Sequence, residues 1–216
     1  MGRGTREKIM NVAIEMFNSK GATNVSTVQL SNQLHISPGN LYYYFDNKEH
    51  LIRSIWLEML APNVGDLFYA EELETKEEAL MDFFLQLSQS IYAFKFFYLE
   101  LPAMLHNDPE LKAIYKERAE KLMLRMEEVF DAWVENGIMK PMDKITKKLL
   151  IENCWTLSQT SITYVTILGF SATVKEGCDN IIQHLYALLF PYFSEESHEK
   201  IHRLFIENNL SFQKYA

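Results

Sequence analysis

The sequence predicts an all-α fold, and three observations support this prediction. Apolar residues recur at i, i+3, i+4 and i+7 through most of the 216 residues, which is the spacing of one face of a helix. Alternating runs rich in β-branched residues, which are typical of strands, are scarce. Glycine and proline occur only 8 and 6 times, and several stand where a helix is expected to begin or end.

The composition narrows the class of protein. Hydrophobic residues make up 48% and aromatics 13%, so the chain is globular and can bury a core in one domain or two. It has no run of about 18 apolar residues and no apolar signal segment, so neither a membrane partner nor export is expected. Cys154 and Cys178 lack metal-site or disulfide spacing, which favours a reducing cytoplasm. The sequence shows no catalytic arrangement, metal cluster or phosphate-binding glycine loop. We therefore predict that the protein is not an enzyme and binds no metal and no cofactor.

The first two helices are expected over residues 5–20 and 25–34. Gly21 stands where a left-handed cap would close the first. Ser26 and Gln29 have the spacing of a capping box at the start of the second. Thr27 lies in that first turn, where its hydroxyl either caps the helix or binds a phosphate oxygen, and both roles stay open.

The third helix is short and is predicted from residue 38 to 45. Ser37 suits the N-cap, and Pro38 suits the first helical position because its missing N–H would have no partner there. At about 100° per residue, Leu41 and Phe45 fall on one side and anchor the helix to a core.

The opposite side of this helix offers little bulk and several polar groups, from Gly39, Asn40, Tyr42 and Tyr43. Such a face suits contact with a large, anionic, hydrogen-bonding surface. The alternative is that the tyrosines are buried for their area, as aromatic residues usually are.

Two short helices joined by a turn of about three residues, after a longer helix, form the helix-turn-helix plan. A fourth helix is expected from Asp46 or Asn47 to about Leu60. Lys48 lies in its first turn, where a cation opposes the helix dipole. A phosphate contact would offset that cost, which favours a functional role for Lys48.

Residues 5–60 resemble the DNA-binding domain of TetR-family transcriptional regulators. The resemblance rests on Thr27, Leu30 and Leu34, on the stretch from Ile36 to Phe45, and on Lys48, Glu49 and Leu51. It implies DNA contacts, mostly at phosphates, and the predicted DNA-binding residues are Thr27, Ser37, Pro38, Gly39, Asn40, Tyr42, Tyr43 and Lys48.

Two positions depart from the family pattern. His35 stands where glycine or alanine is usual, and Ser31 stands where alanine is usual. Histidine tolerates a positive φ better than a branched residue does, so the turn is expected to form with slight strain.

Charge is divided unevenly along the chain, whose net charge is −8. Residues 1–60 carry six basic and five acidic side chains, whereas the remainder carries 15 basic and 24 acidic ones. This suits a small DNA-facing head on an acidic body that repels DNA elsewhere.

We predict two domains, a helix-turn-helix head over residues 1–60 and a helical ligand-binding and dimerisation domain over 61–216. Pro62 and Gly65 suggest a link over residues 61–76. The resemblance implies that helices near 145–168 and 174–192 form a dimer interface. An apolar face too wide for one subunit to cover agrees with this, and comprises Ile181, Ile182, Leu185, Leu188 and Leu189.

A small-molecule effector site is predicted in the body, because methionine and aromatic side chains line adaptable pockets, although at helical spacing they are more often core. Glu100 interrupts an apolar segment and needs a partner, either a cationic ligand or a neighbouring Lys or Arg. The predicted ligand-binding residues are Phe97, Glu100, Met104, Trp155, Gln159 and Thr163.

The sequence therefore predicts a ligand-responsive repressor that binds a palindromic double-stranded DNA operator as a homodimer. The alternative is a helical small-molecule-binding protein in which residues 5–60 are only a packing unit. A third possibility is a regulator without a ligand.

Overall fold

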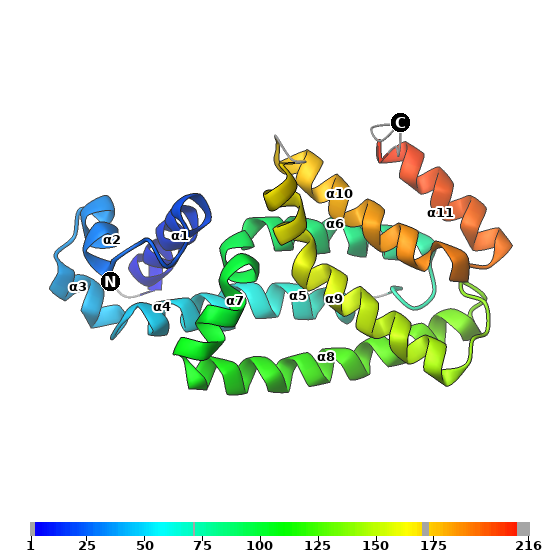
Figure 1. The fold of residues 1–216 in the computed structure, drawn as a ribbon, viewed down its shortest axis with the longest axis horizontal. Coiled ribbons are helices and arrows are strands. Elements are labelled where there is room, and N and C mark those ends of the chain that lie inside the picture. The colour runs from blue at the N-terminus through cyan, green and yellow to red at the C-terminus, as the bar shows by residue number, and fades with distance from the viewer. Residues whose placement is uncertain (1–2, 71, 170–172, 211–216) are drawn as a thin grey trace. The chain divides into compact units, whose positions relative to one another are not determined.

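The computed structural model describes residues 3–70, 72–169 and 173–210, and these ranges contain helices and no strand (Figure 1). The all-α prediction is confirmed. In chain order the helices are α1 (Arg3–Lys20), α2 (Thr27–Leu34), α3 (Pro38–Tyr44), α4 (Lys48–Ile55), α5 (Ala61–Phe68), α6 (Glu77–Ala93), α7 (Lys95–Asn107), α8 (Pro109–Glu135), α9 (Lys144–Leu168), α10 (Val174–Leu189) and α11 (Glu195–Glu207).

The chain forms two compact units. The first comprises Met1–Asn63 and Ala93–Lys116, and the second comprises Val64–Tyr92 and Glu117–Ala216. The first unit thus holds α7 and the start of α8 in addition to the segment predicted as the head. The first unit is thus built from two segments that are far apart in sequence. A single domain boundary, such as the one predicted after residue 60, does not describe it.

The first unit is built around the helix-turn-helix. The apolar stripe of α1 is buried at Ile9, Ala13 and Phe17, and α2 buries Leu30 in the same unit. The capping box of α2 is present, since the Gln29 amide N–H donates to Ser26 Oγ at 3.2 Å and the Ser26 N–H donates to Gln29 Oε1 at 2.8 Å.

The first half of the segment predicted as a link, residues 61–76, is helical. Helix α4 runs without interruption into a π turn (Trp56–Leu60) and then into α5. In that turn the Ala61 N–H bonds the carbonyl of Trp56, five residues back. Pro62 lies in the turn of helix directly after it. A proline that would break a regular helix is therefore accommodated where the hydrogen-bond register already shifts.

The second unit contains α6, α9, α10, α11 and most of α8. Gly137 (φ 74°) and Gly169 (φ 66°) close α8 and α9 in the left-handed conformation. Cys154 and Cys178 are buried and unpaired.

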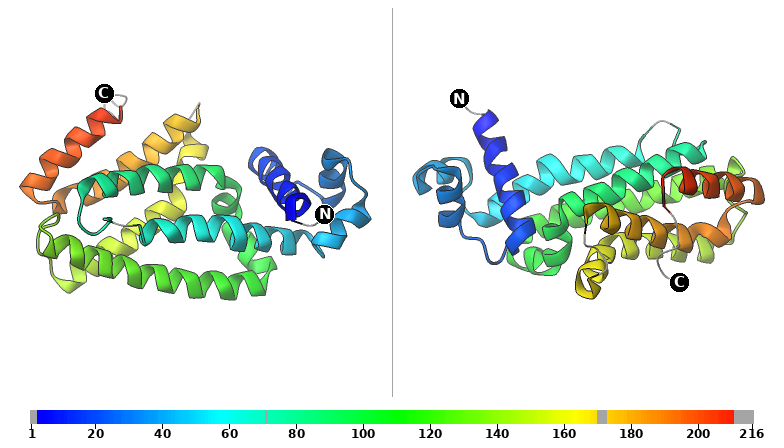
Figure 2. Two further views of the ribbon diagram at one scale, coloured as in Figure 1. Left: turned by 180° about the vertical axis from the view of Figure 1, so that it is seen from behind. Right: turned by 90° about the horizontal axis from the view of Figure 1, so that it is seen from above.

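The apolar face predicted for dimerisation is mostly covered within the single chain, so that interpretation is wrong. Ile181 and Ile182 are fully buried, Leu185 and Leu189 are buried as well, and Leu188 is half-buried. Helices α9 and α10 lie side by side (Figures 1 and 2), and packing inside the second unit accounts for the width of the face. A different apolar stripe, on α9, is exposed instead.

Candidate nucleic-acid interface

The turn between α2 and α3 has the predicted strained geometry. His35 adopts φ 55° and ψ 40°, the left-handed conformation, and its N–H bonds the carbonyls of Asn32 and Ser31. Ser31 is fully buried, and its hydroxyl donates to the Thr27 carbonyl at 2.9 Å. Both departures from the family pattern are therefore compatible with a closed helix-turn-helix.

Helix α3 begins and anchors as its sequence predicts. Ser37 Oγ accepts the Asn40 N–H at 3.2 Å, and Pro38 occupies the first helical position. Leu41 and Phe45 are both fully buried. These two contacts hold the short helix against the unit and fix which of its faces points outward.

The outward face of α3 is not core. Tyr43 is 80% exposed and Tyr42 is 46% exposed, and the residues from Ser37 to Asn40 are exposed as well. The alternative that both tyrosines are buried for their area is therefore excluded. Leu41 and Phe45 supply the buried apolar side of the helix, so the phenol groups of Tyr42 and Tyr43 remain available to a partner.

Gly39 has no internal reason to be glycine. A Cβ added there would find only Ser37 Oγ, at 3.9 Å, within 4 Å. Glycine costs a helix up to about 1 kcal/mol relative to alanine. The absence of a side chain therefore favours close approach of something outside the protein.

Thr27 joins this face from α2. Its hydroxyl lies 3.0 Å from the Tyr42 hydroxyl, so the first turn of α2 and the flank of α3 present two adjacent hydroxyl groups. Hydroxyl groups and free N–H groups at a helix start are typical phosphate ligands.

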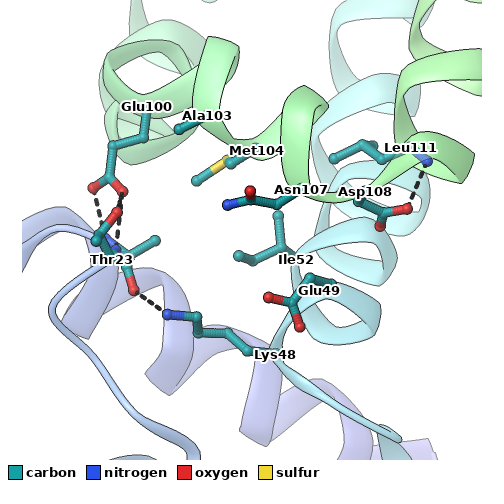
Figure 3. A pocket seen from close by; sticks show the side chains of 11 residues that line it. Thr23, Lys48, Glu49, Ile52, Glu100, Ala103, Met104, Asn107, Asp108 and Leu111 are labelled. Atoms are coloured by element: carbon teal, nitrogen blue, oxygen red, sulfur yellow. Dashed lines mark hydrogen bonds between the residues drawn. The ribbon is translucent and has the colours of Figure 1, made fainter.

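Lys48 lies beside this surface but is engaged inside the unit. Its half-buried side chain donates from Nζ to the Ala22 carbonyl at 3.0 Å (Figure 3). Nζ also donates to the Val25 carbonyl at 3.3 Å. These bonds offset the unfavourable position of the cation at the start of α4. The ammonium has three donors, and the two carbonyls use two of them.

Two other cations of the first unit also hold the fold together. Arg6 pairs with Glu58 of the π turn and lies over the Phe45 ring, 4.9 Å from its centroid. Arg53 of α4 pairs with Asp108 at 2.5 Å and with Glu110 at 3.1 Å. The small basic excess of the head is thus largely used internally.

The residues predicted for ligand binding are divided between the two units. In the first unit, Phe97 is buried against Trp56 and Tyr115, with ring centroids 6.4 and 6.2 Å away. That environment is aromatic core. In the second unit, Trp155, Gln159 and Thr163 are half-buried at successive turns of α9 and share one side of it.

Glu100 has partners that sequence reasoning missed. Its carboxylate accepts the Ala22 N–H at 2.7 Å, the Thr23 N–H at 2.9 Å and the Thr23 hydroxyl (Figure 3). The carboxylate is therefore satisfied by the turn between α1 and α2 without a ligand. The signal available in the sequence was Gly21, because a chain that turns at a helix end exposes N–H groups.

A cavity of about 90 Å³ lies in the first unit, between this turn, α4 and α7. Met104 and Glu100 line it together with Lys48 and Glu49 (Figure 3). Pockets for drug-sized ligands are roughly 300–1,000 Å³, so this cavity does not have the size of an effector site.

Two other kinds of site are absent from the part of the chain that the structure describes. No helix there has the length and apolar character required to cross a bilayer. No group of three or more His, Cys, Asp or Glu side chains is arranged there to hold a metal ion.

An exposed recognition helix supported by two further helices defines a helix-turn-helix DNA-binding protein. Two family models match the chain: bacterial regulatory proteins of the tetR family over residues 9–55, and the bacterial transcriptional repressor TetR over residues 63–201. The second spans well over half of the chain. The protein therefore belongs to the TetR family of bacterial transcriptional regulators.

Curated relatives match between a quarter and a third of the chain. The regulator UidR of Escherichia coli K12 is 41% identical over 54 residues, which cover 25% of this chain and 28% of UidR. AcrR of Shigella flexneri is 30% identical over 63 residues, which cover 29% of each chain. The match thus spans less than a third of the length of these relatives.

Solved structures match nearly the whole chain. A TetR-family regulator from Marinobacter aquaeolei VT8 superposes with a TM-score of 0.84 at 26% identity, covering 94% of this chain and 98% of the other. The ketosteroid regulator KstR2 of Mycobacterium tuberculosis has a TM-score of 0.65 at 18% identity, covering 90% and 97%. The second likeness concerns the fold alone.

Proposed function

We propose that this protein is a cytoplasmic, ligand-responsive repressor that binds a palindromic operator as a homodimer. The observation that carries the proposal is the outward face of α3. It combines an unconstrained glycine with two exposed phenols, and Leu41 and Phe45 hold it rigidly from behind. A surface of this kind is better suited to contact the bases and backbone of a DNA groove than to bind an apolar ligand.

In the proposed complex, α3 enters the major groove, and Gly39 and Asn40 face the bases at its N-terminal end. Thr27, Ser37, Tyr42 and Tyr43 contact phosphates on either side of the groove. Pro38 and Lys48 complete the site, Lys48 through its remaining N–H donor. Two copies of α3 would read half-sites roughly 34–36 Å apart, one helical turn of the duplex.

The exposed apolar stripe of α9 supports the homodimer. Ile145 and Ile167 are 72% and 75% exposed, and Leu149 is 52% exposed on the same side of the helix. Tyr164 and Leu168 extend the stripe. Exposed apolar surface at both ends of one helix favours a protein interface, and a two-fold pair of identical chains would cover it with the same surface.

For the effector, we propose a small, largely apolar molecule bound in the body. Trp155, Gln159 and Thr163 of α9 combine one aromatic surface with two polar groups along one side of a helix. Phe97, Glu100 and Met104, which were also predicted as ligand contacts, lie in the first unit, where Phe97 is aromatic core and the oxygens of Glu100 already have partners. Effector and operator would oppose each other through a reciprocal coupling.

Selection of bound sequences from a random pool of duplex DNA tests the proposal with the full-length protein. We expect an inverted repeat to be enriched, and we expect Tyr43→Ala to bind it at least tenfold more weakly. Tyr69→Ala removes a phenol of the second unit that is 66% exposed, and this variant should bind like the wild type. A pool without enrichment, or equal affinities of wild type and Tyr43→Ala, would favour a protein whose N-terminal helices do not bind DNA.

A further inference from the structure

The Glu100 carboxylate of α7 accepts hydrogen bonds from the donor groups of the turn between α1 and α2, and so holds this turn in place. One carboxylate oxygen, Oε1, accepts the Ala22 N–H, and the other accepts both the N–H and the hydroxyl of Thr23 (Figure 3). Three hydrogen bonds to one ionised group are short and strong contacts. They connect residues 77 and 78 positions apart in the sequence.

The turn is shaped to admit this carboxylate. Gly21 has φ +81°, and a Cβ built on it would lie 2.8 Å from Glu100 Oε1. Both its backbone conformation and the closeness of the carboxylate exclude a side chain there. The glycine and the glutamate therefore act as one unit.

The same turn is held from its other side by α4. Lys48 Nζ donates to the carbonyls of Ala22 and Val25, while Glu100 takes the N–H groups. A cation on the carbonyls and an anion on the N–H groups leave the turn little freedom to move independently of α4 and α7.

This arrangement leads to the DNA-facing surface. Val25 directly precedes Ser26, the N-cap of α2, and Thr27 is the first residue of that helix. The Thr27 hydroxyl in turn lies 3.0 Å from the Tyr42 hydroxyl of α3. A continuous series of hydrogen bonds and adjacent residues thus joins α7 to two proposed phosphate contacts.

A second anchor ties the far end of α7 to α4. Asp108 directly follows α7, and its Oδ2 pairs with Arg53 at 2.5 Å. Its Oδ1 accepts the N–H groups of Glu110 and Leu111 at the start of α8. Helix α7 is therefore fixed to the α1–α2 turn near its middle, through Glu100, and to α4 just past its C-terminal end, through Asp108. A displacement of α7 would carry the turn with it.

We propose that Glu100 is a positioning residue for DNA binding: it sets the place of the α2 N-terminus and hence of Thr27 and Tyr42 against the phosphates. The proposal rests on the DNA-binding function proposed above. Glu100 touches no nucleic acid in this account.

The sign of the effect separates this role from electrostatics. Removal of a carboxylate near DNA normally tightens binding, because it removes repulsion from the phosphates. Loss of positioning has the opposite effect. We expect Glu100→Ala to weaken operator binding at least tenfold, whereas Glu117→Ala, which removes an exposed carboxylate on α8, should leave affinity unchanged or slightly higher.

The measurement uses full-length protein and the selected operator, under conditions where circular dichroism shows each variant to be folded. Amide exchange supplies a local readout: the Ala22 and Thr23 amides should exchange faster in Glu100→Ala, while that of Leu30 in the middle of α2 stays protected. Glu100→Gln keeps the length and one acceptor oxygen and should show an intermediate loss. It provides the test if the alanine variant does not fold.

A double-mutant comparison distinguishes positioning from general stabilisation. Tyr42→Phe should weaken binding severalfold in the wild type and have little effect in Glu100→Ala, because the hydroxyl is then already misplaced. Additive losses, or glutamate variants that bind as tightly as Glu117→Ala, would overturn the inference. Failure of the wild type to bind any duplex would instead overturn the proposed function.

Discussion

The outward faces of α3 and α9 are similarly exposed but chemically opposite. Tyr43 on α3 is 80% exposed and Ile167 on α9 is 75% exposed. The α3 face carries phenols, a hydroxyl, an amide and a bare glycine, whereas the α9 stripe is mainly aliphatic. We propose that both are contact surfaces with partners that match their chemistry: a hydrogen-bonding polyanion for α3 and a second apolar surface for α9.

The largest expected effect comes from placing a charge in the α9 stripe. Ile167→Asp would bury an unpaired carboxylate in the dimer, at a cost of about 3 kcal/mol or more. We expect sedimentation to show a monomer at concentrations where the wild type is a dimer, with unchanged helix content. Ile206→Asp on α11, 62% exposed, is the matched control. Equal masses for the two variants would remove the support for an α9 interface.

Gly39→Ala tests the α3 face through two effects of opposite sign. Alanine should leave stability unchanged or raise it by up to about 1 kcal/mol, because the new Cβ meets only open space. Operator affinity should fall about tenfold, since close approach is lost. Gly65→Ala in α5, which also meets nothing within 4 Å, should alter stability alone. Unchanged affinity in Gly39→Ala would show that the glycine serves no external partner.

Glu77 lies on neither the α3 face nor α9. Its substitution should change the stability of the fold and leave DNA binding and dimerisation unchanged. Burial acts to raise its pKa, but hydrogen bonds from Ser197 at 2.7 Å and Lys200 at 2.9 Å outweigh burial and lower it. A carboxylate with a lowered pKa stabilises the fold above its unfolded pKa of about 4.3 and loses that contribution as pH falls further.

We therefore expect Glu77→Gln to lower the unfolding free energy by about 1 kcal/mol at pH 7. The difference in unfolding free energy between wild type and Glu77→Gln should shrink as the pH of the denaturation measurement falls below about 4.3. Operator affinity and dimer mass should not change. A difference that grew with acidification would contradict the assigned interactions.

The smallest effect is expected for Tyr42→Phe, which removes one hydroxyl beside Thr27 and leaves the ring. Operator affinity should fall by about 0.5–1.5 kcal/mol, the usual net contribution of a single hydrogen bond. Thermal stability should barely move, because the residue is 46% exposed. A larger loss of stability than of affinity would place Tyr42 in the fold rather than in the contact surface.

The parts of the fold that the sequence predicts correctly are specified by near neighbours. The Ser26–Gln29 capping box, the Ser37–Pro38 helix start and the glycine caps at 137 and 169 all depend on residues within four positions. The left-handed His35 follows from the length of the turn between two short helices. Such signals can be recognised because each donor and its acceptor lie in the same stretch of chain.

What the sequence did not predict depends on distant neighbours. The covering of Ile181 and Ile182 is decided by helices that pack from elsewhere in the chain. Glu100 was recognised as a carboxylate in need of a partner, but its partners lie 77 and 78 residues away, and two of the three are backbone N–H groups, which carry no side-chain signature. The continuation of α4 into α5 was missed because Pro62 ordinarily ends a helix.

Fluorine NMR of protein labelled with fluorotyrosine most directly tests whether the outward face of α3 meets DNA. The eleven tyrosines can be assigned by single Tyr→Phe variants. On addition of the selected operator, the signals of Tyr42 and Tyr43 should shift and lose solvent accessibility, while that of Tyr69 stays unchanged. A bound operator that leaves the Tyr43 signal at its free position would contradict the account.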